Sequence, residues 1–314
     1  MLPIGPIVIT RSSSNLPSFI ESVLSWRSRH DRVLSSILLL SPACIMFFIF
    51  VIWPIVQTFR LSFYAWDGIG PKKWIGLGNY RELLNDPVFL HAIANNMIWV
   101  LCYGLAPILG LAIALFLNQK IKGIRVARCL FLLPFVISQV VVGVVFGWFF
   151  SAHFGLFDKI VAAIGLQPVA LLDHEKTAVF GVIAAGLWPQ TAYCMILYLA
   201  GLTALKPELI DAARLDGAEG WTMLRHVVLP QLRPITFLVL LVCCVSALRN
   251  FDLVTIMTGG GPYNSSTVAA YYMFEQIFLS FRYGYGAAIA SVLFVLIEIC
   301  VVYFLWQMTR REQD

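Results

Sequence analysis

Long uncharged stretches dominate the chain, and they determine which elements it predicts. Runs without Asp, Glu, Lys or Arg cover 33–59, 87–119, 129–157 and 177–205. About 20 apolar helical residues cross the roughly 30 Å hydrocarbon core of a bilayer, so each run is long enough to span it. Two shorter runs, 234–248 and 283–297, reach that length only with charged residues included.

This pattern predicts about six transmembrane helices. They fall at roughly 34–58, 96–118, 129–150, 178–202, 234–256 and 284–307. The predicted fold class is therefore all-α, a polytopic membrane helical bundle with a cytoplasmic helical loop between its fourth and fifth spans.

Composition supports a membrane protein. The chain is 60% hydrophobic and 12% charged, with a mean hydropathy of +0.82, whereas soluble domains are about a quarter charged. Most of its Lys and Arg residues fall in the N-terminal lead, in two loops and in the C-terminal tail. Because Lys and Arg mark cytoplasmic loops, we expect both termini to be cytoplasmic. The formal charge of +5 then reflects topology, and we expect no nucleic-acid partner.

The predicted spans divide the chain into three parts. Residues 1–33 form a cytoplasmic lead rather than a cleavable signal, because basic residues follow its apolar stretch and a full span comes next. Within it, 16–34 has the spacing of an amphipathic helix on the membrane surface. The transmembrane domain covers 34–309, and 310–314 is a cytoplasmic tail. A turn-rich outer loop, 60–95, predicts one short helix near 80–84.

Several kinds of chemistry have no support in the sequence. Seven cysteines lie mostly inside spans without a CxxC pair, and five histidines are scattered, so we expect no metal site. The sequence has no Gly-Lys dipeptide and hence no phosphate loop of the form GxxxxGK[ST]. We therefore expect no catalytic residue, no cofactor bound by this chain and no ATP hydrolysis by it.

The polar stretch 203–233 predicts two short helices. Pro207 suits the first turn of the first helix, and Gly217 allows the turn after it. Asp216 is placed to cap the second helix, with Glu219 completing a capping box. Pro230 and Pro234 should end that helix and begin the fifth span.

An ordinary helix-turn-helix linker would satisfy the same capping rules. Two further features favour a docking surface instead. Ala212 and Ala213 let another surface approach the backbone closely, and Leu209, Ile210 and Leu215 offer apolar side chains to a partner.

This stretch resembles the EAA loop of permeases of binding-protein-dependent ABC importers, in the spacing of their carbohydrate branch. The resemblance rests on DAARLDGA at 211–218, then Trp221, Leu229-Pro230 and Pro234. It extends to Pro54, Ser62-Phe63, GLGNY at 76–80, LLPFVISQVVVG at 132–143, Phe251-Asp252 and GGGPYNSST at 259–267, the last as in the first of two unlike permeases. Two departures are Asp211, where the family usually has glutamate, and Leu224, where an aromatic is common.

The resemblance implies a role and a set of partners. The loop would be a coupling helix that docks on an ATP-binding subunit, through Glu208, Asp211, Ala212, Ala213, Arg214, Leu215, Asp216, Gly217 and Ala218. The partners would be a second permease, a dimer of ATP-binding subunits that carries ATP and Mg, and an extracytoplasmic solute-binding protein. The location would be the bacterial cytoplasmic (inner) membrane, with a sugar, polyol, glycerophosphate or oligosaccharide as cargo.

Polar groups inside spans are costly and mark candidate substrate paths. The candidate substrate-path residues are Trp188, Gln190 and Tyr193, around a possible kink at Pro189, together with Asn250 and Asp252. Arg249 and Asp252, three residues apart, could pair on one helix face. Packing anchors and a local ion pair are the competing interpretations, and Glu298 would face either a companion permease or the cavity.

Other function classes fit less well. An ion-coupled secondary carrier would need intramembrane carboxylate or histidine relays and usually inverted repeats, and only Asp252 and Glu298 qualify. A non-transporting scaffold or a membrane enzyme has no positive feature in the sequence.

Overall fold

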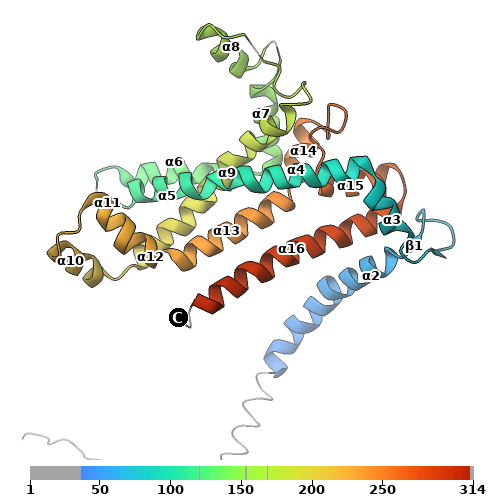
Figure 1. Cartoon of the computed structure of the whole chain (residues 1–314), viewed down its shortest axis with the longest axis horizontal. Helices are drawn as coiled ribbons and strands as arrows, with labels where there is room; N and C mark the ends of the chain where they lie inside the picture. The colour runs from blue at the N-terminus through green and yellow to red at the C-terminus, as the bar shows by residue number, and fades with distance from the viewer. Residues whose placement is uncertain (1–36, 120, 153, 168, 312–314) are drawn as a thin grey trace, which may run out of the picture. The chain divides into compact units, whose positions relative to one another are not determined.

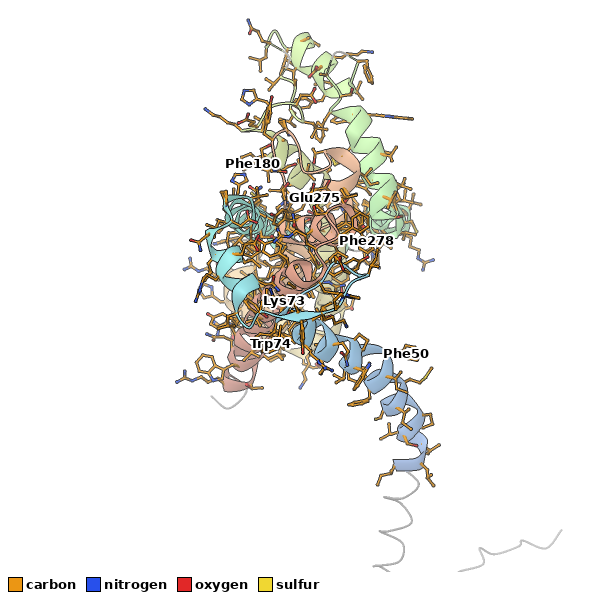
Figure 2. All side chains as sticks on the ribbon, turned by 90° about the vertical axis from the view of Figure 1, so that its right-hand side faces the viewer. Phe50, Lys73, Trp74, Phe180, Glu275 and Phe278 are labelled. Carbon is orange, nitrogen blue, oxygen red and sulfur yellow. The ribbon has the colours of Figure 1, made fainter. Side chains whose placement is uncertain are left out.

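The computed structural model describes residues 37–119, 121–152, 154–167 and 169–311. The predicted amphipathic lead at 16–34 lies outside these residues. The chain divides into two units, Met1–Gln57 and Thr58–Asp314. The described part of the first unit belongs to one apolar helix, Ile37–Leu61, whose membrane-length window buries no residue within the chain. Phe50 lies on this helix and is 68% exposed (Figure 2).

The described elements are almost all helical, which confirms the predicted fold class (Figure 1). After η1 (Phe48–Ile52) and α2 (Trp53–Leu61) come β1 (Tyr64–Ala65), β2 (Lys73–Trp74), α3 (Gly78–Asn85), α4 (Pro87–Tyr103), α5 (Leu105–Leu117), α6 (Ile124–Val136), α7 (Gln139–Phe149), α8 (Leu156–Ala163), α9 (Ala178–Ala204), α10 (Pro207–Leu215), α11 (Gly220–Met223), η2 (Leu224–Val228), α12 (Leu229–Gln231), α13 (Arg233–Leu248), α14 (Asp252–Met257), α15 (Ala269–Phe274), η3 (Glu275–Leu279) and α16 (Tyr283–Arg311). The two short strands pair antiparallel in the outer loop, and α3 is the short helix expected there.

Helix lengths support four to six membrane crossings. By length and composition, Ile37–Leu61, Pro87–Leu117, Ala178–Ala204 and Tyr283–Arg310 can each cross a membrane. Two bent pairs raise the number to six if each pair is one span. These pairs are Ile124–Val136 with Gln139–Phe149, bent by 95°, and Gly220–Gln231 with Arg233–Leu248, bent by 72°.

Two predicted spans are not single straight helices. The prediction of one helix over 129–150 is wrong, because Ile137 and Ser138 adopt extended ψ angles of 136° and 141° and separate α6 from α7. The prediction of one helix over 234–256 is also wrong, because α13 ends at Leu248 and α14 begins only at Asp252. Hydropathy does not report such breaks, since the residues at 137–138 are uncharged.

Helix α9 forms the centre of the second unit, with 61% of its membrane-length window buried. It packs closely on α5, where a Cβ added to Gly110 would lie 2.6 Å from Cys194 Cβ and 2.8 Å from the backbone nitrogen of Met195. Small residues let helix backbones approach closely inside membranes. Pro189 lies buried inside α9 without ending it.

Two neighbouring amides tie α4 to the segments around α13 and α15. Asn95 Nδ2 donates to the carbonyls of Ser265 and Thr267, at 2.8 Å each. Asn96 Oδ1 accepts the backbone N–H of Ala269 at 2.9 Å. Both side chains are almost fully buried, and buried amides are stabilising only when they are hydrogen-bonded. Together they fix the Gly-rich segment 259–267 against the helical core.

Candidate functional site: an exposed loop helix and a polar cavity

Helix α10 has no buried residue, although it carries large apolar side chains. Leu209 is 48% exposed and Leu215 is 91% exposed, and Trp221 on α11 is 68% exposed. Ile210 and Ala213 are half-buried, and Ala212 is exposed. The helix lies at one end of the bundle, at the left of Figure 1. Exposed apolar side chains on a helix that the rest of the chain does not cover are typical of an interaction surface.

The end of α10 is built by backbone hydrogen bonds. The Ala218 N–H donates to the Ala213 carbonyl at 2.9 Å, and the Gly217 N–H donates to Arg214 at 3.0 Å. Gly217 has a φ of +80°, a conformation that glycine adopts at little cost. This is the glycine-terminated C-cap of a helix, so the predicted turn at Gly217 is confirmed.

The predicted capping box is wrong. Asp216 is the C-cap of α10, and its position before Gly217 places it too early to cap the next helix. Glu219 is the N-cap of α11, without a side-chain cap hydrogen bond. The extended backbone of Glu219, with φ −130° and ψ 159°, starts the second helix. Both carboxylates are therefore left on the surface.

Pro230 also behaves differently from the prediction. The second helix runs through it to Gln231, and the chain bends by 72° before α13. Pro234 lies in the first turn of α13, as expected. The sharp bend sets α10 and α11 apart from the apolar helix that follows.

Arg214 and Asp211 form an ion pair on the open face of α10. Arg214 Nη1 lies 3.2 Å from Asp211 Oδ1, with side chains 68% and 69% exposed. An exposed pair three residues apart contributes only about 0.3–0.5 kcal/mol. These charges remain available to a partner, and so does the carboxylate of Glu208, which is exposed in the first turn.

A polar cavity of about 230 Å³ lies among α4, α7, α9 and the α13–α14 break. Three of the predicted path residues, Gln190, Asn250 and Asp252, line it. Asn250 Oδ1 is buried without a hydrogen-bond partner among the described residues. A buried polar atom of this kind is costly unless water or a solute satisfies it.

The two predicted aromatic residues lie elsewhere. Trp188 is 42% exposed and packs against Phe146, with ring centroids 5.8 Å apart. Tyr193 stacks on Phe135 at 5.1 Å. Neither lines the cavity. Trp188 lies two positions from Gln190 and so projects from another face of α9, and Tyr193, three positions after Gln190, is held against Phe135.

Arg249 and Asp252 do not share a helix face. The break at 249–251 separates them, and no ion pair joins them in the part of the chain that the structure describes. Both line the cavity. The helix break therefore turns a predicted local pair into two charged groups that face the same polar space.

Sequence reasoning missed three other residues of the cavity. Tyr103, Gln139 and Ser246 line it as well. Gln139 could have been found as an uncompensated amide inside an apolar run. Tyr103 and Ser246 carry no such signal, since isolated hydroxyls are common in spans.

Glu298 lies midway along α16 on an exposed face. It does not line the polar cavity. A carboxylate near the middle of a span is costly against lipid.

A family model described as "Binding-protein-dependent transport system inner membrane component" matches residues 106–310. The chain belongs to this family. It is therefore a multi-pass inner membrane transport subunit, a permease. The matched segment contains both α10 and the polar cavity.

Curated relatives of the permease match over most of their length. The trehalose/maltose transport system permease protein of Thermococcus litoralis is 31% identical over 278 residues, covering 88% of this chain and 94% of the relative. The alpha-glucoside transport system permease protein of Rhizobium meliloti is 32% identical over 296 residues, covering 91% and 86%. These matches confirm the predicted resemblance to carbohydrate importer permeases.

Solved structures confirm the fold. A bacterial ABC transporter involved in the import of the acidic polysaccharide alginate has a chain that matches with a TM-score of 0.76 at 24% identity. That match covers 91% of this permease and 98% of that chain. A structure of the bacterial alginate transporter with its alginate pentasaccharide-bound periplasmic protein matches equally well, at 23% identity.

Proposed function

We propose that the permease is the membrane-spanning subunit of an ATP-driven carbohydrate importer and that α10 couples it to an ATP-binding subunit. The observation that carries the proposal is an amphipathic surface helix with no buried residue, which ends in a glycine cap and is separated from α13 by a 72° bend further along the chain. A partner that covers Leu209 and Leu215 would remove exposed apolar surface from water, which is favourable.

ATP binding and hydrolysis belong to that partner in this proposal, together with Mg. The end of the bundle that carries α10 is then cytoplasmic, as are both termini. Closure of two ATP-binding subunits would push on Glu208 to Ala218, and the helix bundle would switch between inward-facing and outward-facing states by rigid-body motion.

The polar cavity is the candidate solute path. Gln190, Asn250 and Asp252 offer amide and carboxylate groups that can hydrogen-bond the hydroxyls of a sugar or polyol. Arg249 adds a donor, so a charged sugar also fits the chemistry. The names of the relatives, which include trehalose/maltose, alpha-glucoside and sulfoquinovosyl glycerol transport, support a glycoside cargo.

A second permease and an extracytoplasmic solute-binding protein complete the proposed assembly. Glu298 on the exposed face of α16 would lie against the second permease rather than against lipid. The structure of the alginate transporter in complex with its periplasmic protein supports a solute-binding partner. We expect that partner to bind at the end of the bundle opposite α10.

The first experiment is purification of the permease from its native membrane in mild detergent, followed by mass spectrometry of what accompanies it. We expect an ATP-binding subunit and a second permease to accompany it, in a ratio of about two to one. A chain that purifies alone or as a homo-oligomer would contradict the proposal.

A further inference from the structure

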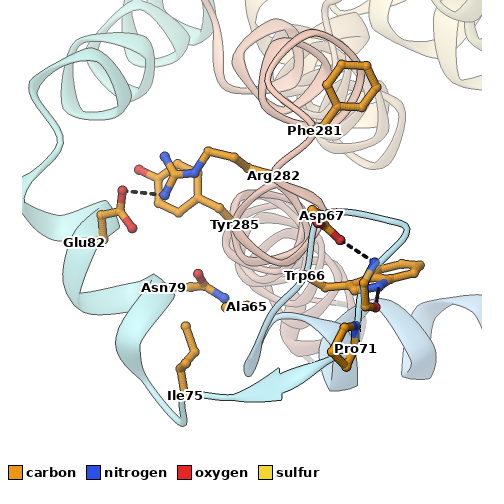
Figure 3. Close-up of a pocket in the computed structure, with 11 residues that line it drawn as sticks. Ala65, Trp66, Asp67, Pro71, Ile75, Asn79, Glu82, Phe281, Arg282 and Tyr285 are labelled. Atoms are coloured by element: carbon orange, nitrogen blue, oxygen red, sulfur yellow. Dashed lines mark hydrogen bonds and ion pairs between the residues drawn. The ribbon is translucent and has the colours of Figure 1, made fainter.

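A pocket of about 420 Å³ opens to solvent at the end of the bundle opposite α10. It lies between the loop after β1, helix α3 and the start of α16, and Figure 3 shows the side chains around it. The pocket has about as much polar as apolar wall. The pocket lies far from α10 and outside the polar cavity, so it belongs to neither of these sites.

The loop on one side of the pocket is held rigidly. Asp67 Oδ1 accepts the backbone N–H groups of Ile69 at 3.1 Å and Gly70 at 2.8 Å. Trp66 Nε1 donates to the Gly70 carbonyl at 2.9 Å, and the Lys72 ammonium lies 4.4 Å from the Trp66 ring centroid. The N–H groups of Gly70 and Ile69 lower the pKa of Asp67, which keeps it ionised. No side chain covers the second carboxylate oxygen of Asp67, Oδ2, which stays open to solvent.

Asn79 places a carbonyl oxygen in the wall of the pocket. Its side chain is almost fully buried, and Nδ2 donates to the carbonyls of Ser62 at 2.7 Å and Tyr64 at 3.0 Å. These two acceptors fix the orientation of the amide, because the nitrogen must face them. Oδ1 therefore points the other way, toward Glu82 and Tyr285 (Figure 3), with no hydrogen-bond donor among the described residues.

An ion pair forms the opposite wall. Arg282 Nη2 lies 2.6 Å from Glu82 Oε1, and the guanidinium lies 4.2 Å from the Tyr285 ring centroid. The charged side chains that line the pocket are therefore one guanidinium and two carboxylates, Glu82 and Asp67. Three acceptors of the wall remain open, Asp67 Oδ2, Asn79 Oδ1 and the second oxygen of Glu82, beside the remaining N–H groups of Arg282.

Two exposed aromatic side chains lie at this end of the bundle, and one of them lines the pocket. Phe281, which lines the pocket, is 59% exposed and has a φ of +54°. A bulky residue in the left-handed region is a backbone outlier, and such outliers cluster at functional sites. Phe278, one turn earlier, is 57% exposed. Aromatic and arginine side chains around a rigid pocket are the residues that most often anchor protein interfaces.

We infer that this pocket receives a basic side chain, lysine or arginine, of the extracytoplasmic solute-binding protein. The inference rests on the proposed function, which supplies the partner and its side of the membrane. Three preorganised acceptors and an excess of one carboxylate are complementary to an ammonium or guanidinium group. The exposed rings of Phe278 and Phe281 would cover its apolar stem.

The test uses the whole importer, with all of its subunits, in lipid nanodiscs, and measures the Kd of its solute-binding protein by surface plasmon resonance. Asp67→Asn is the main variant, because asparagine can still accept the N–H groups of Ile69 and Gly70 while losing the charge. We expect Kd to rise about fivefold, the effect of one partly exposed ion pair. Asp67→Lys should raise it further, because it adds a repulsive charge.

Asp173→Asn is the matched control, since Asp173 is an exposed carboxylate in another loop and does not line the pocket. It should leave Kd unchanged. Values within about twofold of wild type for both Asp67 variants would overturn the inference while leaving the proposed function intact. A wild-type importer that binds no solute-binding protein would overturn the proposed function, and the inference with it.

Discussion

The Tyr285 hydroxyl, at the start of α16, donates a 2.6 Å hydrogen bond to Asp86 Oδ2. The Tyr272 hydroxyl donates to the same oxygen at 2.6 Å. Asp86 Oδ1 accepts the backbone N–H groups of Val88 and Phe89 and so caps α4. One carboxylate therefore joins the start of α4 to α15 and α16. The two tyrosines that it binds lie 186 and 199 residues later in the chain.

Asp86→Asn should lower the thermal stability of the permease in detergent. Burial raises the pKa of Asp86, but the two tyrosine hydroxyls and two N–H groups outweigh it, so the pKa lies below the usual 3.8. A lowered folded-state pKa means stability that is present above pH 3.8 and is lost as pH falls through the folded value. We expect a loss of about 1 kcal/mol at pH 7.

The measurement is the unfolding midpoint of wild type and Asp86→Asn between pH 7 and pH 3. The difference between them should begin to shrink as the pH falls below about 4, where the carboxylate of the unfolded wild type becomes protonated, and should vanish once the pH falls below the lower pKa of the folded state. A difference that is independent of pH would show that the charge of Asp86 is unimportant.

Changes on α10 should separate coupling from folding. Leu215→Ser removes an apolar side chain that is 91% exposed, so the stability of the isolated permease should stay within about 0.5 kcal/mol of wild type. Charge reversal at Asp216 and a bulky residue at Ala213 act on the same surface. We expect each change to lower uptake and ATPase activity of the assembled importer at least about tenfold, the effect of losing one anchor of an interface.

Uptake and membrane-associated ATPase activity are measured side by side for these variants. Thr203→Ala, on an exposed position outside α10, is the control and should retain both. Full activity of all three α10 variants would remove the docking role from this helix.

The polar cavity predicts a contrast within α9. Gln190→Ala should reduce solute uptake about tenfold, because Gln190 lines the cavity and each lost polar contact weakens solute binding by about 1 kcal/mol or more. Trp188→Leu should have little effect, since Trp188 packs outside the cavity against Phe146. Initial uptake rates at equal amounts of membrane-inserted protein distinguish the two, and equal losses would argue for a general packing effect.

Two glycines in helices offer a further comparison. A Cβ at Gly110 would meet the backbone of α9 at 2.8 Å, whereas a Cβ at Gly147 meets nothing within 4 Å. Gly110→Ala should destabilise the permease by about 1–3 kcal/mol through overpacking, and Gly147→Ala should be neutral or slightly stabilising. Thermal unfolding in detergent tests both variants. Equal unfolding midpoints would show that α5 and α9 can move apart to accommodate the added methyl group.

Much of this architecture follows from patterns that a sequence shows directly. Hydropathy located the helices because lipid requires about 20 apolar residues in each crossing, and Pro207 and Gly217 located α10 because each has a narrow conformational role. The break at 137–138 was missed because it carries no charge or glycine. The break at 249–251 does carry a charged residue, Arg249, but its spacing from Asp252 was interpreted as a pair on one continuous helix. The same break at 249–251 is what carries Arg249 and Asp252 into the cavity.

The amides of Asn95 and Asn96 show a different limit. Their position inside an apolar run indicates that they are functional or bonded, but their partners lie about 150 to 170 residues later in the chain. Only the folded structure reveals which carbonyls they bind. The positions of Trp188 and Tyr193 relative to the cavity could not be predicted for a related reason. An aromatic ring in a span gives no indication of which side of the helix faces water.

The uncovered surface of α10 has a consequence for the life of the chain in the cell. A helix held at its ends by backbone hydrogen bonds and contacted little by its own bundle opens locally at low free energy. In the proposed assembly an ATP-binding subunit covers this segment, and until then it would be open to cytoplasmic proteases. We expect an orphan permease to be degraded from this loop, so that quality control would match the number of permeases to the number of their partners.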